Sequence, residues 1–259
     1  PTRDKVLLVA KQLNYVRDRA AVRLKTGKTC VVAFLMNRWD ANQPAFKDLL
    51  LGVCDAPRDT EYHMIVLPES VEGDRLATPR YVVDRGLADA MVITHTTPQD
   101  TRVRYLMERN FAFCTHGRTR LLDDGLARDP FGHAHSFVDF ANEQYAQASV
   151  EALVARGRKK LAILLPREGG TFRMHLLEGF MQACEQAKVE GVTAANLDMD
   201  GSSEHIYTWA IQKAKQFDGL VVTRESPLMA LMGGLGDAGL VLGRELDVVT
   251  KYSTSTPMY

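Results

Sequence analysis

Short apolar runs alternate with amphipathic segments over most of the chain. In the first half, the largely apolar runs are Cys30–Met36, Tyr62–Leu67, Ala90–Thr94 and Phe111–Cys114. Such runs are typical of strands that are buried on both faces. Apolar residues at helical spacing lie between them, as at Phe46, Leu49 and Val53, and indicate amphipathic helices. This order predicts an α/β fold in which helices cover both faces of a parallel sheet.

The second half repeats this order of elements. Its expected strands are Leu161–Leu165, Val192–Leu197, Leu220–Thr223 and Leu246–Thr250. Its expected helices are 142–156, one after Gly170, one capped by Ser203, and one over about 227–235. The interval 120–137 is rich in turn residues and separates the two halves. The sequence therefore predicts two doubly wound parallel-sheet lobes, at 30–135 and 136–259.

Two helix predictions are specific enough to be checked against a structure. Thr78 and Pro79 are expected to be the N-cap and first residue of one helix. The helix after Gly170 is expected to turn four residues inward: Met174, Leu177, Met181 and Cys184.

Two segments precede the first apolar run. Residues 2–13 have helical spacing of apolar residues, and Asn14 suits a left-handed helix end. Residues 15–29 form a basic stretch whose few apolar residues cannot build a core. The stretch is either a solvated linker or a helix that binds an anionic partner. Because a helix this short is unfavourable alone, we expect it to become ordered only against a partner.

The composition restricts the classes of function. The formal net charge of the 259 residues is zero, which excludes a uniformly basic nucleic-acid coat and makes any such binding local. The 4 cysteines are widely spaced, at Cys30, Cys54, Cys114 and Cys184, which favours free thiols in a reducing cytoplasm. No apolar run approaches the length that spans a bilayer, so we expect a cytoplasmic protein without a membrane partner.

The sequence lacks the common catalytic and nucleotide-binding motifs, including G-x-G-x-x-G, the Walker loop, G-x-S-x-G and H-E-x-x-H. Gly169-Gly170-Thr171 either holds an anion at a helix start or is only a turn. His133-Ala-His135 lacks further metal ligands, so a solvated pair is the simpler interpretation. We therefore expect no enzyme, no cofactor and no metal site.

Polar residues follow the predicted strands at their carboxyl ends, where parallel sheets bind ligands. These residues are Asn37 and Arg38, His95 and Thr96, His116 and Arg118, Arg167, Arg224 and Glu225, and Lys251 and Tyr252. Each alone is ordinary loop polarity. Together they predict a polar cleft between the two lobes.

Ordered motifs over essentially the whole chain resemble the lac repressor/galactose repressor (LacI/GalR) family of bacterial transcription regulators. Residues 2–15 resemble the last helix of its helix-turn-helix domain. The stretch from Tyr15 through an Ala-rich turn to Leu24-Lys-Thr-Gly-Lys-Thr29 resembles its hinge. The second lobe carries further matching motifs, at Val138–Glu143, Gly157–Ile163, Glu178–Phe180 and Gly239–Val249.

The resemblance implies lobes of the type I periplasmic-binding-protein fold, preceded by a remnant of a helix-turn-helix domain. It divides the chain into 1–15 (end of that domain), 16–29 (hinge), 30–135 (a dimerising lobe) and 136–259 (a second lobe). The family's recognition helix is absent, and we expect the chain to be incomplete at both ends.

The resemblance also implies a homodimer, joined through the first lobe, that binds operator DNA. Two hinge helices would lie in the minor groove, with Leu24 as an apolar wedge and Asp18 as the N-cap. Ala21 would allow close approach. The residues expected to contact phosphates or groove edges are Arg19, Arg23 and Lys25.

A small sugar effector between the lobes is the remaining implication. Its expected ligands are Asn37, Phe46, His95, His116, Arg118, Arg173, His175, Arg224 and Lys251. The chain departs from the family where an Arg is replaced by Leu176 and where the late strand ends in Lys251 rather than a carboxylate. We therefore favour a sugar acid or another anion. The alternative is a periplasmic-type solute-binding protein, which would need no hinge.

Overall fold

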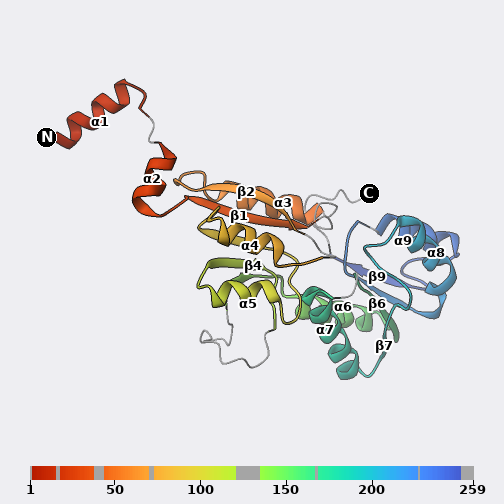
Figure 1. Cartoon of the computed structure of the whole chain (residues 1–259). Coiled ribbons are helices and arrows are strands. Elements are labelled where there is room, and N and C mark those ends of the chain that lie inside the picture. Colours follow the sequence, from red (N-terminus) through yellow and green to blue (C-terminus); the bar gives the residue numbers. More distant parts are fainter. Residues whose placement is uncertain are drawn as a thin grey trace.

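The structure, a computed structural model, describes residues 2–15, 18–37, 44–69, 73–120, 135–166, 169–226 and 228–251. Within this part of the chain, two parallel sheets form separate lobes (Figure 1). The strands of lobe 1 follow the order β2-β1-β3-β4-β5. They are β1 (Val31–Asn37), β2 (His63–Glu69), β3 (Ala90–Ile93), β4 (Ala112–His116) and β5 (Phe137–Val138).

The strands of lobe 2 follow the order β7-β6-β8-β9. They are β6 (Lys160–Leu164), β7 (Glu190–Thr193), β8 (Gly219–Val222) and β9 (Asp247–Thr250). All neighbouring strands in both sheets are parallel. The predicted α/β class with two parallel-sheet lobes is therefore confirmed.

Helices follow the strands in both lobes. Lobe 1 contains α3 (Pro44–Asp55), α4 (Ala77–Asp84) and α5 (Thr101–Glu108). Lobe 2 contains α6 (Asn142–Ala155), α7 (Thr171–Ala187), α8 (Ser203–Lys213), the short 3-10 helix η2 (Ala214–Gln216) and α9 (Leu228–Asp237). Two further helices, α1 (Thr2–Gln12) and α2 (Arg19–Thr26), precede lobe 1, and α1 extends away from it (Figure 1). None of the described helices is long and apolar enough to cross a membrane.

Alternate residues of β6 enter two different cores, which explains why its sequence is continuously apolar. Leu161 and Ile163 pack with the buried residues of α6 and α7. Ala162 and Leu164 pack on the other face with the buried residues of α8 and α9. Helices therefore cover both faces of the sheet of lobe 2, as expected for a buried parallel strand.

The central strand β1 divides its side chains in the same way. Ala33 and Leu35 join a buried cluster with Val82 of α4 and Leu106 of α5. Phe34 points to the other face, where its ring centroid lies 5.8 Å from that of Phe46 in α3. Phe46, an expected effector ligand, is thus buried against this strand as part of lobe 1.

Two helix starts differ from the sequence prediction. Helix α4 begins at Ala77, and the Thr78 hydroxyl donates to the Pro68 carbonyl (2.9 Å) instead of capping the helix. The N-cap of α8 is Ser202, whose hydroxyl accepts from the His205 N–H (3.2 Å), rather than Ser203. The Thr78 hydroxyl is used in a tertiary contact, and at α8 the neighbouring Ser202 supplies the cap that was predicted for Ser203.

The inward face of α7 also differs from the prediction. His175, Leu176, Gly179 and Phe180 are buried, whereas Met181 is 45% exposed. Met174 and Leu177 are half-buried, and of the four expected residues Cys184 alone belongs to the buried set. Apolar residues occur around much of this helix, so spacing alone did not fix which face meets the sheet.

Gly179 provides a test of the packing between α6 and α7. A Cβ at this position would lie 2.5 Å from the carbonyl oxygen of Glu143 and 2.6 Å from its Cα. Because these are backbone atoms, we expect Gly179→Ala to lower the free energy of unfolding by about 1–3 kcal/mol. Gly236→Ala in α9 is the control, since a Cβ there meets no atom within 4 Å.

Urea denaturation of both variants would measure the difference. The control is expected to be neutral or slightly stabilising, because alanine favours the helix by up to about 1 kcal/mol. Equal stability of the two variants would contradict the close approach of α6 and α7.

Candidate effector site and hinge helix

The basic stretch contains a short helix, α2, with both ends capped. The Asp18 carboxylate accepts from the N–H groups of Ala20 (2.7 Å) and Ala21 (3.2 Å), as predicted for an N-cap. At the other end Gly27 is left-handed, with φ 72°, and its N–H donates to the Arg23 carbonyl. The structure shows that local caps satisfy both ends of this helix, and the expectation that the stretch becomes ordered only against a partner stays a prediction.

The residues expected to contact DNA differ in their surroundings. Leu24 is 91% exposed, and Ala21 and Lys25 are also exposed. Arg23 instead donates from Nη2 to the Gly86 carbonyl of lobe 1 (2.9 Å). Arg19 begins α2, and its side chain lies outside the described part. The helix thus presents an apolar side chain to solvent while one arginine ties it to lobe 1.

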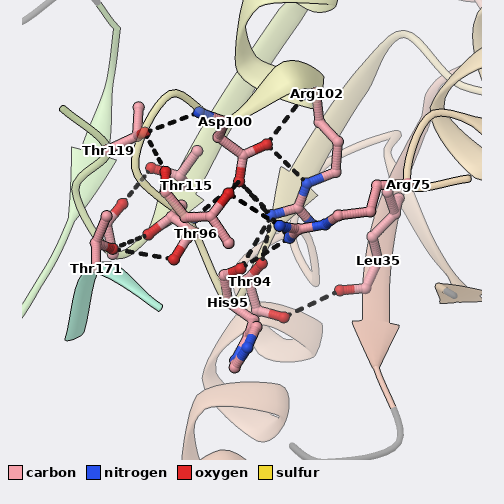
Figure 2. A network of polar contacts seen from close by, with 12 residues as sticks. Leu35, Arg75, Thr94, His95, Thr96, Asp100, Arg102, Thr115, Thr119 and Thr171 are labelled. Carbon is pink, nitrogen blue, oxygen red and sulfur yellow. Dashed lines mark hydrogen bonds and ion pairs between the residues drawn. The ribbon is translucent and has the colours of Figure 1, made fainter. Parts of the chain in front are cut away.

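The carboxyl edge of lobe 1 contains a buried ionic cluster that sequence reasoning missed (Figure 2). Arg102 of α5 is 0% exposed and donates to both oxygens of Asp100 (3.0 and 2.7 Å) and to Glu69. Its Nη2 also donates to the carbonyls of Thr94 and His95 (both 3.1 Å). In the sequence, the signal for this cluster was the pair Asp100 and Arg102 at the start of a helix, and such charged pairs are common on protein surfaces.

The pKa values of the two carboxylates in this cluster, Asp100 and Glu69, shift in opposite directions. Burial opposes the charge of Asp100, but hydrogen bonding and attraction from Arg102 outweigh it and lower the pKa of Asp100 to about 2. Burial raises the pKa of Glu69 despite the attraction of Arg102. Arg75 adds a second guanidinium, whose Nη2 donates to the His95 carbonyl (3.0 Å).

His95 lies between cations of the two lobes. Its backbone is left-handed (φ 53°), and Figure 2 shows its ring directed away from the guanidinium groups that bind its carbonyl. Burial and the positive charges of Arg75, Arg102 and Arg224 lower its pKa to about 4. Arg224 belongs to lobe 2, so a neutral His95 marks a region of positive potential that both lobes create.

Thr96 and Thr171 join the two lobes directly. Their hydroxyl oxygens are 2.6 Å apart, and the Thr171 N–H donates to the Thr96 carbonyl (2.9 Å). Gly117 lies against the same hydroxyl, since a Cβ there would be 2.6 Å from Thr96 Oγ1. The contact uses the Thr171 N–H of the Gly169-Gly170-Thr171 motif, which supports the turn interpretation over an anion site at that N–H.

Arg118 and Arg120 form ion pairs between the lobes. The Arg118 guanidinium donates to Asp139 (3.1 Å) and to both oxygens of Glu143 (3.0 and 2.7 Å). Arg120 forms a bidentate pair with Glu178 of α7 (2.9 and 2.8 Å). Arg118, an expected effector ligand, therefore already has carboxylate partners in this structure.

Two further expected effector ligands, Arg173 and His175, lie in α7. Arg173 donates to the Pro166 carbonyl (2.8 Å). His175 is buried with its Nδ1 3.8 Å from Asp139, and burial lowers its pKa although Glu143 favours its charge. Both residues thus lie at the start of the helix that meets lobe 1.

Lys251 follows β9 and contacts aromatic rings. Its Nζ donates to Asn142 Oδ1 (3.1 Å) and lies 5.2, 4.9 and 4.6 Å from the ring centroids of Phe140, Tyr145 and Phe172. Burial and the charge of Arg224 lower its pKa to about 8, while Asp139 acts in the opposite direction. Arg224 itself pairs with Asp200 (2.8 Å) and stacks on Phe172.

The remaining expected ligands lie at the ends of lobe 1 strands. Asn37 is buried and lies opposite Glu69 in the register of β1 and β2. His116 ends β4, and its ring meets Phe140 edge-on with centroids 5.9 Å apart. Arg38, Arg167, Tyr252 and His133 lie outside the described residues. The structure therefore brings His95, Arg224 and Lys251 to one region, and Arg118 and His175 to the Asp139 carboxylate.

Removing the guanidinium of Arg102 tests the buried cluster. Arg102→Met leaves the carboxylates of Asp100 and Glu69 buried without their partner, so we expect a loss of about 3–5 kcal/mol in the free energy of unfolding. Arg80→Met is the matched control, because its pair with Asp74 is half exposed and contributes less than about 1 kcal/mol. Denaturant melts of both variants measure the contrast, and similar losses would contradict it.

The neutral His95 predicts a pH dependence of stability. Because its pKa falls from 6.5 to about 4 on folding, the unfolded chain binds more protons in this range. Its contribution is fully present above pH 6.5 and is lost as the pH falls through about 4. Asparagine tolerates a left-handed backbone, so it is a suitable replacement at this position. The melting temperature of His95→Asn should therefore change less than that of the wild type between these pH values.

His205→Asn in α8 provides the control, since that histidine is exposed. Melting temperatures measured across the pH range should keep the wild-type slope in this control. A wild-type slope in His95→Asn as well would contradict the assignment.

Comparisons with known proteins agree with the fold and with the order of motifs. The chain is 25% identical over 253 residues to the HTH-type transcriptional regulator AglR of Rhizobium meliloti, covering 96% of this chain and 68% of that protein. No protein-family model matches the chain.

Two solved structures show the same fold. A LacI-family regulatory protein from Chloroflexus aggregans superposes with a TM-score of 0.69 at 18% identity, covering 85% of this chain and 77% of that one. The transcriptional regulator CelR in complex with cellobiose gives 0.70 at 16% identity, covering 96% and 73%. Regulators therefore recur in both the sequence and the fold comparisons.

Proposed function

We propose that this chain, a regulator of the LacI/GalR type, represses transcription as a dimer on operator DNA and responds to a sugar or sugar acid held between its lobes. Leu24 is the main support for DNA binding, because this leucine is 91% exposed on a capped basic helix. Exposure of a large apolar side chain to water is unfavourable, whereas the same side chain can insert between stacked base pairs and kink the DNA duplex.

Helix α2 is fastened to the part of lobe 1 that leads into β3. Arg23 binds the Gly86 carbonyl, and the Asp89 carboxylate accepts from the N–H groups of Thr29 and Cys30 (both 2.8 Å). Burial opposes the charge of Asp89, but these hydrogen bonds lower its pKa. A movement of lobe 1 would therefore carry α2 with it, which supports coupling between a ligand and the DNA-binding helix.

The polar contacts between the lobes support a ligand-dependent change of their relative position. Thr96 binds Thr171, and the Arg118 and Arg120 ion pairs cross from one lobe to the other. A ligand that binds one arrangement of these contacts more tightly shifts the equilibrium toward it. The complex of CelR with cellobiose supports a sugar-like ligand for the present chain.

Exposed apolar residues of lobe 1 support its role in dimerisation. Leu51 of α3, Val66 of the edge strand β2 and Tyr81 of α4 are all exposed in the single chain. The alternative, a periplasmic-type solute-binding protein, would share the lobes but leave Leu24 and α2 without a role. DNA binding distinguishes the two functions.

Leu24→Ala tests the DNA-binding proposal in the regulator expressed from its complete gene. Duplexes selected by that regulator from a random-sequence library would serve as the probe. We expect the variant to bind them at least tenfold more weakly, because the apolar wedge is lost. Its melting temperature should not change, since Leu24 is 91% exposed.

Met229→Ala is the control, because Met229 is a similarly exposed apolar residue of lobe 2. Affinities from fluorescence anisotropy should leave this control unchanged. If Leu24→Ala binds the DNA within twofold of the wild-type affinity, Leu24 is not an apolar wedge. If the regulator selects no DNA from the library, the solute-binding alternative is favoured.

A further inference from the structure

Lys251 is a cation at the junction of the lobes that lacks a carboxylate partner. Among the described residues, no carboxylate lies within 4.0 Å of its Nζ, which donates a hydrogen bond to the neutral amide of Asn142 (3.1 Å). An ammonium group has three donors. Charges shielded from water are usually paired in proteins, so this arrangement leaves donors and charge for a partner that the described residues do not supply.

The surroundings of Lys251 hold the ammonium in place. Its ring contacts come from Phe140 before α6, Tyr145 within α6 and Phe172 in the first turn of α7. The Tyr145 hydroxyl donates to the Val222 carbonyl (2.7 Å), which fixes that ring. Asn142 Nδ2 donates to Asp139 (3.1 Å), which orients the amide so that its oxygen faces Lys251. The group is therefore preorganised.

Nearby cations are already paired, in contrast to Lys251. Arg224 shares the Phe172 ring but pairs with Asp200 (2.8 Å). Arg118 pairs with Glu143 (2.7 Å). Lys251 is thus the member of this group without a carboxylate within 4.0 Å among the described residues, although Asp139 lies near enough to favour its charge. A monoanion matches this single unpaired charge, whereas a dianionic phosphate would need a second.

We propose that the effector is a sugar acid whose carboxylate binds the ammonium of Lys251. The inference rests on the proposed ligand response and narrows it from sugars in general to monoanionic uronic or aldonic acids. The ligand carboxylate accepts hydrogen bonds from the remaining Lys251 donors, and Arg118 and Arg224, the described arginines discussed above, already pair with carboxylates of the chain. A neutral sugar of the same shape would leave the ammonium uncompensated on closure of the lobes.

Matched ligand pairs test this inference by calorimetry. Glucuronate and gluconate are compared with glucose, and galacturonate with galactose. We expect at least one acid to bind at least tenfold more tightly than its neutral sugar. Lys251→Met should weaken that acid by 10- to 100-fold, as expected for a lost charged hydrogen bond. Lys213→Met removes an equal charge from the exposed face of α8 and should leave binding unchanged.

The stability of the ligand-free variants separates recognition from a structural role. Removal of a half-buried charge that has no carboxylate within 4.0 Å among the described residues should leave the melting temperature of Lys251→Met equal to or above that of the wild type. Lys251→Gln gives a second variant with the same expectation. A folded Lys251→Met that keeps full acid affinity, or acids that bind no better than their neutral sugars, would overturn the inference.

These outcomes are distinct from failure of the proposed function. If a neutral sugar binds the protein and causes it to release DNA, the proposed regulator function is retained and the sugar-acid assignment is overturned. An acid that binds through Lys251 without changing DNA affinity would keep the assignment and contradict the repressor response.

Discussion

Arg102 holds the carboxyl edge of lobe 1 in the shape that the lobe junction requires. Its guanidinium is fully buried and binds two carboxylates together with the carbonyls of Thr94 and His95. Because these carbonyls precede Thr96, the guanidinium also positions the hydroxyl that meets Thr171 of lobe 2. A buried charge of this kind costs desolvation and is tolerated when every lone pair around it is used. The geometry of the lobe junction thus depends on an ion pair buried within lobe 1.

Cations from both lobes meet near His95 at the junction. Burial, together with Arg75 and Arg102 from lobe 1 and Arg224 from lobe 2, lowers the pKa of His95 and keeps it neutral. Aromatic rings hold Lys251, which has no carboxylate within 4.0 Å among the described residues. The arginines that cross between the lobes are neutralised by their own carboxylates. Paired charges therefore join the lobes. In the proposed function, the ammonium of Lys251, which has no carboxylate within 4.0 Å among the described residues, is left to recognise the ligand.

The hinge helix connects this junction to the surface proposed to bind DNA. Both ends of α2 are capped within the chain itself, and Arg23 donates a hydrogen bond that fixes the helix to lobe 1. Preformed helices lose less conformational entropy on binding than disordered ones do. A ligand that moves lobe 1 would then change the placement of Leu24 rather than fold or unfold the helix.

The sequence alone determined the order of elements, the parallel sheets, the Asp18 cap and the polar strand ends, because these follow from local periodicity and from the geometry of parallel strands. Tertiary structure decided which of those polar residues remain available. Arg118 has acidic partners 21 and 25 residues away in the sequence, and Lys251 meets Asn142 across 109 residues. Such pairings depend on which strands become neighbours and on how the lobes meet, and hydrophobic spacing carries no record of either. The Arg102 cluster escaped the sequence prediction for the same reason.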